Sequence, residues 1–405
     1  MQKQRDKPVR VFVTGIGIIS ALGDNVEKNH ESLVKSQAGV RNAVHFESYY
    51  TAVLPFGEIE TSNEELKEIL NLKDEPGYTR TCLLAVKAFE EAIADSRLSS
   101  SELSSFDTAL ISASTVGGMC LTDQLYEDAN CKSDGSEYLE AYGPGSHTLK
   151  LVEKYKINGF TDTINTACSS SANAIMLGAR LIKSGRANRA VVGGVDALAK
   201  YTVNGFNALK ILSKNPCKPF DENRDGLNLG EAAAYLVLES EELVGDKKIY
   251  AEILGYGNSN DAHHPSAMSE NAVGAIRSMK DAIESAGISP DQINYINAHG
   301  TGTPNNDSVE LTGITEIFKN VPPFSSTKSY TGHTLGAAGA VEAIFSILSI
   351  NNSEIYPSLH IETAMKDFED LPVTSYQSEA QVNYVLSNSF GFGGNCTSLV
   401  LGKVL

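Results

Sequence analysis

Several features that mark other classes of protein are missing from this 405-residue chain. Its six cysteines include no CxxC pair and no regular spacing, which argues against a zinc ribbon or a disulfide framework and for reduced thiols. No HExxH motif is present, and the adjacent His263 and His264 cannot share one helical face as a metal-binding pair would. Acidic residues outnumber Lys and Arg by 50 to 33, and the net charge of −17 argues against nucleic acid or an anionic membrane as a partner.

Long apolar runs are also missing. No apolar stretch reaches the ~18 residues that a bilayer-spanning helix needs. The first residues, MQKQRDKPVRVFVTG, lead directly into a predicted strand over 9–14, without the apolar region and cleavage pattern of a signal peptide. We therefore expect a cytoplasmic enzyme with no membrane contact. Its length suits two domain-sized units or one large duplicated unit.

A complete dinucleotide-binding motif is missing as well. The segment GIGIIS at 15–20 follows the first predicted strand but lacks the third glycine of GxGxxG. No acidic residue is clearly placed after a second strand, so we do not expect NAD as a cofactor.

The stretch at 161–185, TDTINTACSSSANAIMLGARLIKSG, is the chemical centre of the sequence. β-Branched and polar residues over 161–166 predict a strand, and the apolar spacing from Ala172 onward predicts a helix, with Cys168 at the turn between them. The partial positive charge of a helix N-terminus favours a thiolate, and its free N–H groups can hold an oxyanion. An isolated cysteine is more often an inert buried residue. The assignment of Cys168 therefore depends on the rest of the chain.

The two halves of the chain resemble each other. EEAIADSRLSSSEL at 90–103 and KDAIESAGISPDQI at 280–293 share Ala-Ile and later apolar positions, and each precedes a predicted strand that ends in a glycine-rich loop. The strand–turn–helix at Cys168 has a counterpart over 325–350. This pattern predicts a duplicated α/β fold with a site at the seam, where strand ends from both halves converge. Between the predicted elements, we expect no clear structure over 114–145 and a loop through Phe206 and Lys210.

Four predicted turns from the two halves carry reactive side chains. A nucleophilic thiol needs nearby basic groups and oxyanion donors, which these turns would supply. The turns are TACSS at 166–170, NAHGTGT at 297–303, KSYTGHTLGAAG at 328–339 and NSFGFGG at 388–394.

Together with VFVTGIGIISALG and PFDENRDGLNLGE, these segments are similar to the signatures of the β-ketoacyl-acyl-carrier-protein synthases. The resemblance covers essentially the whole chain and is to the elongating synthase I/II group, which has a Cys-His-His site. It implies an α/β thiolase-like duplicated fold, a five-layer α-β-α-β-α sandwich. The half at 1–248 would carry the nucleophile and the half at 249–405 the two histidines. The resemblance also implies a homodimer, although a heterodimer remains an alternative.

The same resemblance implies catalytic roles. Cys168 would accept an acyl chain from a carrier-protein thioester, and a malonyl thioester would then lose CO2 and attack the acyl carbonyl. His299 and His333 would act as neutral imidazoles that stabilise the enolate, and Lys328 would set the electrostatics around them. The backbone N–H groups of Cys168 and Phe392 would form the oxyanion hole, and Phe392 would also act as a gate. No metal or redox cofactor is implied for the reaction, since loss of CO2 drives it.

Other residues match the family less directly. Lys210 would lie beside the entrance, and Thr122 stands where a branched apolar residue often ends the acyl pocket. The candidate substrate-binding residues are Phe206, His264, Thr301, Thr303, Phe390 and Thr122. The positions that resemble a monovalent-cation site of some relatives, with no ion as the alternative, are Asn297, Glu342, Ser387 and Asn388. The carboxylates expected to be structural charges around the site are Glu231, Asp307, Glu310 and Glu342.

The sequence departs from the common pattern in three places. GEAAA at 230–234 lacks the usual second glycine, 120–160 is short, and the helix expected to dock the acyl carrier protein has mixed charge over 64–75. A specialised polyene, polyketide or pigment pathway is therefore an alternative to fatty-acid synthesis. A coenzyme A-dependent thiolase-like acyltransferase is disfavoured by TGH at 331–333, and a non-catalytic chain-length partner subunit by Cys168. An unrelated acyl-binding protein is a further alternative.

Overall fold

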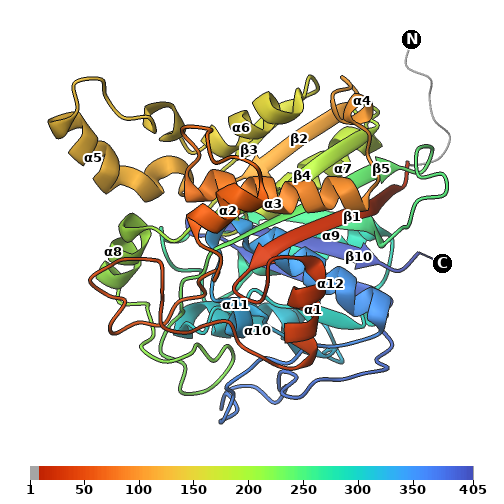
Figure 1. Ribbon diagram of the computed structural model, residues 1–405. Helices are drawn as coiled ribbons and strands as arrows, with labels where there is room; N and C mark the ends of the chain where they lie inside the picture. Colours follow the sequence, from red (N-terminus) through yellow and green to blue (C-terminus); the bar gives the residue numbers. More distant parts are fainter. Residues whose placement is uncertain (1–8, 405) are drawn as a thin grey trace.

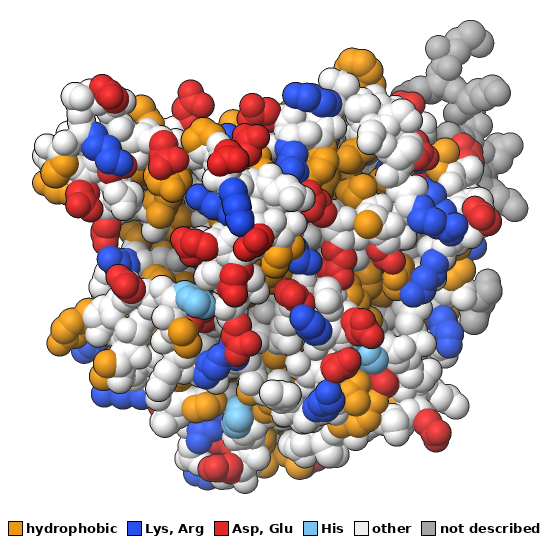
Figure 2. Space-filling model, viewed as in Figure 1, with side chains coloured by type: hydrophobic (Ala, Val, Ile, Leu, Met, Phe, Trp, Pro, Cys, Tyr) orange, Lys and Arg blue, Asp and Glu red, His pale blue; other side chains and the backbone are white. Residues whose placement is uncertain are grey.

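The computed structural model describes residues 9–404 (Figure 1; space-filling view in Figure 2). Its strands are β1 (Val11–Ser20), β2 (Thr108–Ala113), β3 (Thr161–Ile164), β4 (Arg189–Asp196), β5 (Ala232–Ser240), β6 (Ala251–Asn260), β7 (Tyr295–Asn297), β8 (Phe324–Ser325), β9 (Tyr384–Phe390) and β10 (Asn395–Gly402). The α-helices are α1 (Val26–Val34), α2 (Asn63–Ile69), α3 (Arg80–Asp95), α4 (Ser100–Leu103), α5 (Thr122–Cys131), α6 (Ser146–Tyr155), α7 (Ser170–Lys183), α8 (Lys200–Ala208), α9 (Val273–Ala286), α10 (Pro304–Ile317), α11 (Lys328–Thr331) and α12 (Ala338–Asn352). Short 3-10 helices are η1 (Gly117–Leu121), η2 (Leu139–Ala141), η3 (Pro290–Gln292) and η4 (Leu335–Ala337).

The strand order displays the duplication directly. The first half runs β3-β2-β4-β5-β1 and the second half runs β8-β7-β9-β10-β6, and the two join where β1 pairs with β6. Pairing directions repeat as well, because β2 is parallel to β3 and β4 just as β7 is parallel to β8 and β9, while β5 and β10 are antiparallel to their neighbours. The link between the halves is short, with only Phe12 opposite Glu252 and Val13 opposite Ala251. The two five-stranded halves therefore fold as related units.

Helices separate and cover the two halves of the sheet in five layers. Helix α3 packs on β1 and β5, and α9 packs on β6 and β10, while α7 and α12 pack on each other between the two halves. The expected α-β-α-β-α sandwich is confirmed. The predicted boundary at 248/249 falls between β5 and β6 and stays a prediction.

Side-chain alternation builds a separate core on each face. Along β5, Leu236 and Leu238 join the central core with α7 and α12, while Tyr235 and Val237 face the outer core under α3. This is the period-2 pattern of a strand buried on both faces. Contrary to the expectation from the sequence, the stretch Leu335–Asn352, which includes α12, has the length and apolar composition of a membrane-spanning helix, but 89% of it is buried inside the fold. A helix that is apolar all round is typical of such a central layer.

Two segments differ from the sequence-based expectation. The stretch at 114–145 contains η1, α5 and η2, and the expected loop through Phe206 is helix α8. Both α5 and α8 lie at the left margin of Figure 1 and bury little of their surface. Periodicity missed them because a short helix with few buried positions has no clear apolar stripe.

Candidate active site

Cys168 lies in a tight turn between β3 and α7. Ala167, just before it, has a φ of +55°, in the left-handed region that non-glycine residues rarely adopt. The Ser170 side chain holds this turn, since its hydroxyl accepts from the Thr166 N–H at 2.8 Å and donates to the Ala167 carbonyl. The thiol is 6% exposed at the start of α7. A strained turn held by its own hydrogen bonds is common where a side chain must be presented for reaction.

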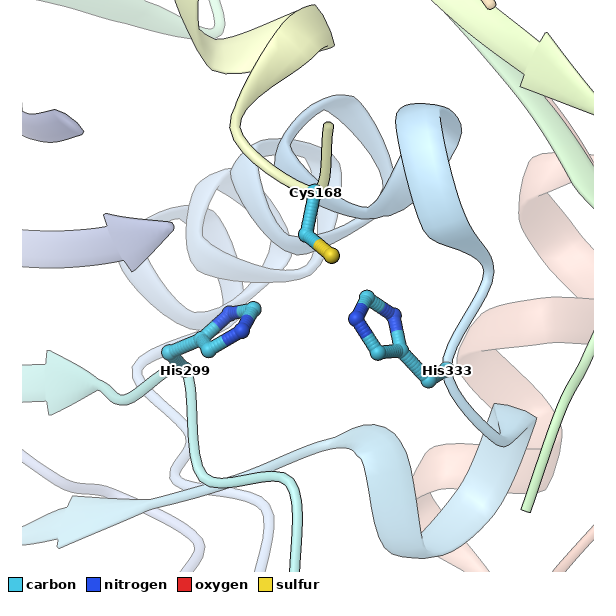
Figure 3. A group of neighbouring side chains, drawn as sticks. All are labelled: Cys168, His299 and His333. Atoms are coloured by element: carbon cyan, nitrogen blue, oxygen red, sulfur yellow. The ribbon is translucent and has the colours of Figure 1, made fainter. Parts of the chain in front are cut away.

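Two histidines from the second half face this thiol. Figure 3 shows the Cys168 side chain pointing between the rings of His299 and His333. The sulfur and one nitrogen of each ring all lie within 4.8 Å of one another. The centroids of the His299 and His333 rings are 5.4 Å apart, and the ring planes are inclined at 84°. His299 follows β7 and His333 follows α11, so both halves contribute to the constellation.

Hydrogen bonds define the tautomer of each ring. The Lys328 ammonium donates to His299 Nδ1 at 3.2 Å, and the Leu335 N–H donates to His333 Nδ1 at 3.2 Å. Burial lowers the pKa of both histidines well below the usual 6.5, and the Lys328 charge lowers both further. A neutral ring whose Nδ1 accepts must carry its proton on Nε2. The site therefore offers two uncharged Nε2–H donors.

The thiol itself is protonated at neutral pH. Burial raises the pKa of Cys168 to about 11, against the opposing effects of the Lys328 charge and of a hydrogen bond from the Phe392 backbone N–H. The expectation that the helix N-terminus favours a thiolate is therefore outweighed by desolvation. The Phe392 N–H faces the sulfur, and after acyl transfer the carbonyl oxygen would lie beside that sulfur.

Lys328 is buried behind the histidines. It is 2% exposed, donates to the His299 carbonyl at 2.6 Å, and pairs with the Glu342 carboxylate. Burial raises the pKa of Glu342 to about 7, and Lys328 opposes this rise. The ammonium therefore ties α12 to the His299 turn.

A cavity of about 360 Å³ opens from the side chains of Cys168, His299 and His333. Phe206 and Phe392 stack across it with ring centroids 5.6 Å apart at 17°. Its walls are mainly apolar, which suits an acyl chain. The lining includes Lys210, Ile211, Leu227, Met268, Thr301, Thr303, Asn305, Asn306 and Phe390.

Two family models match this chain, the β-ketoacyl synthase N-terminal domain over residues 9–243 and the β-ketoacyl synthase C-terminal domain over residues 250–362. The chain belongs to the β-ketoacyl synthase family. The "3-oxoacyl-[acyl-carrier-protein] synthase 2" of Staphylococcus aureus (strain MRSA252) is 32% identical over 98% of each chain. The protein of that name from Coxiella burnetii is 33% identical over 98% of this chain and 99% of its own.

Solved ketosynthase structures are similar over 98% of the chain. "The ishigamide ketosynthase/chain length factor" has a TM-score of 0.92 at 29% identity over the whole of that chain. The ketosynthase ApeO in complex with its chain length factor ApeC from Xenorhabdus doucetiae has a TM-score of 0.85 at 32% identity over 98% of that chain. The AntDE:AntF complex, a type II polyketide synthase acyl-carrier protein with its ketosynthase, has a TM-score of 0.87 at 25% identity over the whole of that chain.

In this ketoacyl synthase, the cavity brings together most of the predicted substrate-binding residues. Phe206, Thr301, Thr303 and Phe390 all line it, as does Lys210 at the predicted entrance. This convergence requires both halves of the chain. Phe206 lies on α8 of the first half, whereas Thr301 and Thr303 follow β7 and Phe390 ends β9 in the second half.

Two predicted substrate-binding residues lie elsewhere in the synthase. Thr122 is exposed at the start of α5, just after η1, and borders a separate cavity of about 710 Å³. His264 is also exposed, and its Nδ1 accepts from the Ser266 N–H at 3.2 Å. The structure therefore does not place Thr122 at the end of the Cys168 cavity or His264 in its wall.

Buried carboxylates hold the histidine loops of the synthase. Glu310 accepts from the backbone N–H groups of His299 and Gly300, each at 2.8 Å. Asp307 accepts from the Thr301 N–H at 2.9 Å. These contacts give Glu310 and Asp307 the structural role expected for them. Glu231 is paired with Arg80 and does not line the cavity beside Cys168.

Asp196 holds another loop, and sequence reasoning missed it. It ends β4, is fully buried, and accepts from the N–H groups of Thr115, Val116 and Gly336. Gly336 follows the His333 turn, so Asp196 connects that turn to the first half. The only signal in the sequence is a charged residue at the end of a buried strand.

The predicted cation positions include two unpartnered oxygens. Within residues 9–404, Asn297 Oδ1 and Glu342 Oε2 are buried and have no hydrogen-bond partner. Amide and carboxylate oxygens suit a hard cation, so these two residues fit such an ion. Asn388 is less suited, because its amide donates to Glu310 at 3.1 Å and accepts from Ser398 at 2.8 Å.

Proposed function

We propose that this chain is an elongating β-ketoacyl-acyl-carrier-protein synthase that performs decarboxylative Claisen condensation. The observation that carries the proposal is the buried thiol of Cys168 beside two neutral imidazoles that each hold a proton on Nε2. The cavity next to it is large enough for part of an acyl chain. The relatives named 3-oxoacyl-[acyl-carrier-protein] synthase 2 support the same reaction class.

The first step is acyl transfer to Cys168. The sulfur attacks the thioester carbonyl of an acyl carrier protein, the carrier thiol leaves, and the Cys168 proton goes with it. The transient oxyanion requires two donors, which are the N–H groups of Cys168 and Phe392. Loss of one such donor costs about 3 kcal/mol in comparable acyl-transfer sites.

The second step uses the histidines. A malonyl thioester binds with its carbonyl oxygen near the Nε2–H groups of His299 and His333, which stabilise the enolate formed as CO2 leaves. The enolate carbon attacks the acyl-Cys168 carbonyl, the β-ketoacyl carrier is released, and the sulfur takes up a proton. Neutral rings suit this role, because they donate hydrogen bonds without the cost of burying a charge.

The competing functions fit the site less well. A non-catalytic chain-length subunit has no use for a reactive thiol, whereas Cys168 lies beside two histidines and a cavity. A coenzyme A-dependent acyltransferase would use a different partner set in place of His333. The pathway, either fatty-acid or polyene and polyketide synthesis, depends on the chain that the cavity accepts.

We infer that an acyl carrier protein and a second subunit are the partners of this chain in the cytoplasm. Exposed Lys210 at the cavity entrance would attract an acidic carrier. Among the described residues, strand β3 ends the sheet and its outer edge pairs with no other strand, and the apolar side chains of Phe160 and Leu149 nearby are 49% and 66% exposed. A second copy pairing along this edge would cover them. Size-exclusion chromatography with light scattering distinguishes this homodimer from a chain that needs a chain length factor.

Intact-protein mass spectrometry tests the proposed reaction. The wild-type chain, mixed with a panel of acyl-carrier thioesters, should gain one acyl mass at Cys168 and lose it again when malonyl carrier is added. Cys168→Ala should gain none and should form no β-ketoacyl product. His333→Ala should still be acylated but should not condense. Full condensation by Cys168→Ala would refute the proposal.

A further inference from the structure

A polar network lies directly behind the Cys168 turn and joins the two halves of the chain. Asn395, at the start of β10, is its centre. The Asn395 Oδ1 accepts from Ser169 Oγ at 2.7 Å, from Asn173 Nδ2 at 2.9 Å and from Asn258 Nδ2 at 3.0 Å. Asn173 in turn donates to Thr166 Oγ1 at 2.8 Å. One amide oxygen of the second half therefore holds residues on both sides of Cys168.

The backbone of Asn395 holds the opposite wall of the site. Its carbonyl accepts from the Gly391 N–H at 2.8 Å and so closes the turn that contains Phe392. That turn lies directly on the Cys168 turn, since a Cβ at Gly391 would be 2.6 Å from the Thr166 carbonyl oxygen and 3.2 Å from the Cys168 nitrogen. Asn395 thus contacts both segments that supply an oxyanion-hole N–H group.

We propose that Asn395 is a positioning residue that holds the Cys168 and Phe392 N–H groups in one geometry for acyl transfer. The proposal rests on the proposed ketoacyl synthase function. Asn395 does not line the cavity, and its side chain reaches the thiol only through Ser169 and Asn173. It acts through the two turns and not on the substrate.

Oxyanion donors work only when their geometry is held closely. Displacement by about 1 Å can cost roughly 100-fold in rate. Without the Asn395 amide, the Ser169 hydroxyl keeps only two local partners, which are the hydroxyl and the backbone carbonyl of Thr166. The Cys168 turn, already strained at Ala167, would then be free to move relative to the Phe392 turn.

Single-turnover acylation of purified full-length variants, followed by intact mass, tests the proposal. Asn395→Ala should lower the acylation rate constant by about 10- to 100-fold while the concentration of acyl carrier needed for half-saturation stays unchanged. Ser169→Ala should do the same, and the double variant should be no slower than either single variant. Asn395→Asp keeps the acceptor oxygen and should recover most of the rate, with its pH profile moved to higher pH by the added negative charge.

Asn258→Ala is the matched control. Asn258 donates to the side-chain oxygens of Asn395, Asn173 and Thr397 but forms no hydrogen bond with residues 166–169 or 390–393, so this variant should acylate within about twofold of the wild-type rate. The proposal is overturned if folded Asn395→Ala acylates at the wild-type rate, or if Asn258→Ala is impaired equally.

Alkylation of Cys168 by iodoacetamide separates this proposal from the proposed function. It needs no acyl substrate and reports whether the Phe392 N–H still faces the sulfur. The pH midpoint of alkylation should rise in Asn395→Ala, and an unchanged midpoint counts against positioning. A wild-type chain that is alkylated but accepts no acyl group would instead contradict the proposed function.

Discussion

Replacing Gly391 by alanine should separate the two halves of the oxyanion hole. An added Cβ would lie 2.6 Å from the Thr166 carbonyl oxygen, where ordinary contact begins near 3.4 Å. The Phe392 turn must therefore move by about 0.8 Å away from the Cys168 turn, because the new methyl group meets a backbone carbonyl and no flexible side chain can give way. A displaced N–H donor loses most of its effect, about 3 kcal/mol, so acylation should slow by roughly 100-fold.

Gly205→Ala is the matched control for this experiment. Gly205 lies in α8, close to the cavity-lining Phe206, and a Cβ there meets nothing within 4 Å. Since alanine favours a helix over glycine, this variant should be about 0.5–1 kcal/mol more stable and fully active. Stopped-flow mixing with acyl carrier, followed by mass detection of acyl-Cys168, gives the rates, and circular dichroism confirms folding. A folded Gly391→Ala that acylates as fast as Gly205→Ala would refute the reasoning.

Two further predictions concern buried charge. Lys328→Met leaves the Glu342 carboxylate buried without its cation, so the free energy of unfolding in urea should fall by about 3–5 kcal/mol. Adding Glu342→Gln to the same chain should restore part of this loss. Equal stability of the single Lys328→Met variant and the double variant would contradict the pairing. Burial lowers the pKa of His147 to about 4, so the folded chain stays unprotonated there while the unfolded chain binds a proton below about pH 6.5. The contribution of this residue to the free energy of unfolding is therefore complete above pH 6.5 and should fall by about 3 kcal/mol as the pH drops to 4. In His147→Gln, the slope of the unfolding free energy against pH should be smaller by about 1.4 kcal/mol per pH unit in that range. An unchanged slope would show that His147 is not the titrating group.

Much of the fold could be predicted because its signals are local. The strand–turn–helix at Cys168, the helix over Arg80–Asp95 and the apolar α12 all show clear periodicity in the sequence. Helices α5 and α8 could not be found this way, since few of their side chains are buried and the apolar stripe is weak. Thr122 borders a different cavity from the one expected, and the sequence gives no sign of this because the direction of the chain after η1 is not a local property.

The candidate site divides in the same manner. Sequence motifs predicted Cys168, His299, His333 and Lys328 as site residues, because each lies in a turn whose composition is read directly from neighbouring residues, and the structure brings the four together. Asp196 and Asn395 had no comparable motif, and both act on residues more than 100 positions away. Their importance comes from contacts across the seam between the halves.

By itself, the sequence indicated the duplication, the well-buried strands and helices and the candidate reactive side chains, since these depend on spacing over a few residues. Only the tertiary structure decided the charge state of the thiol and the tautomers of the histidines. Cys168 is a protonated thiol and the histidines are neutral because packing removes water from all three, and the histidine protons lie on Nε2 because Lys328 and Leu335 donate to the Nδ1 atoms. Desolvation and long-range hydrogen bonds depend on which distant segments meet, and no local pattern encodes that.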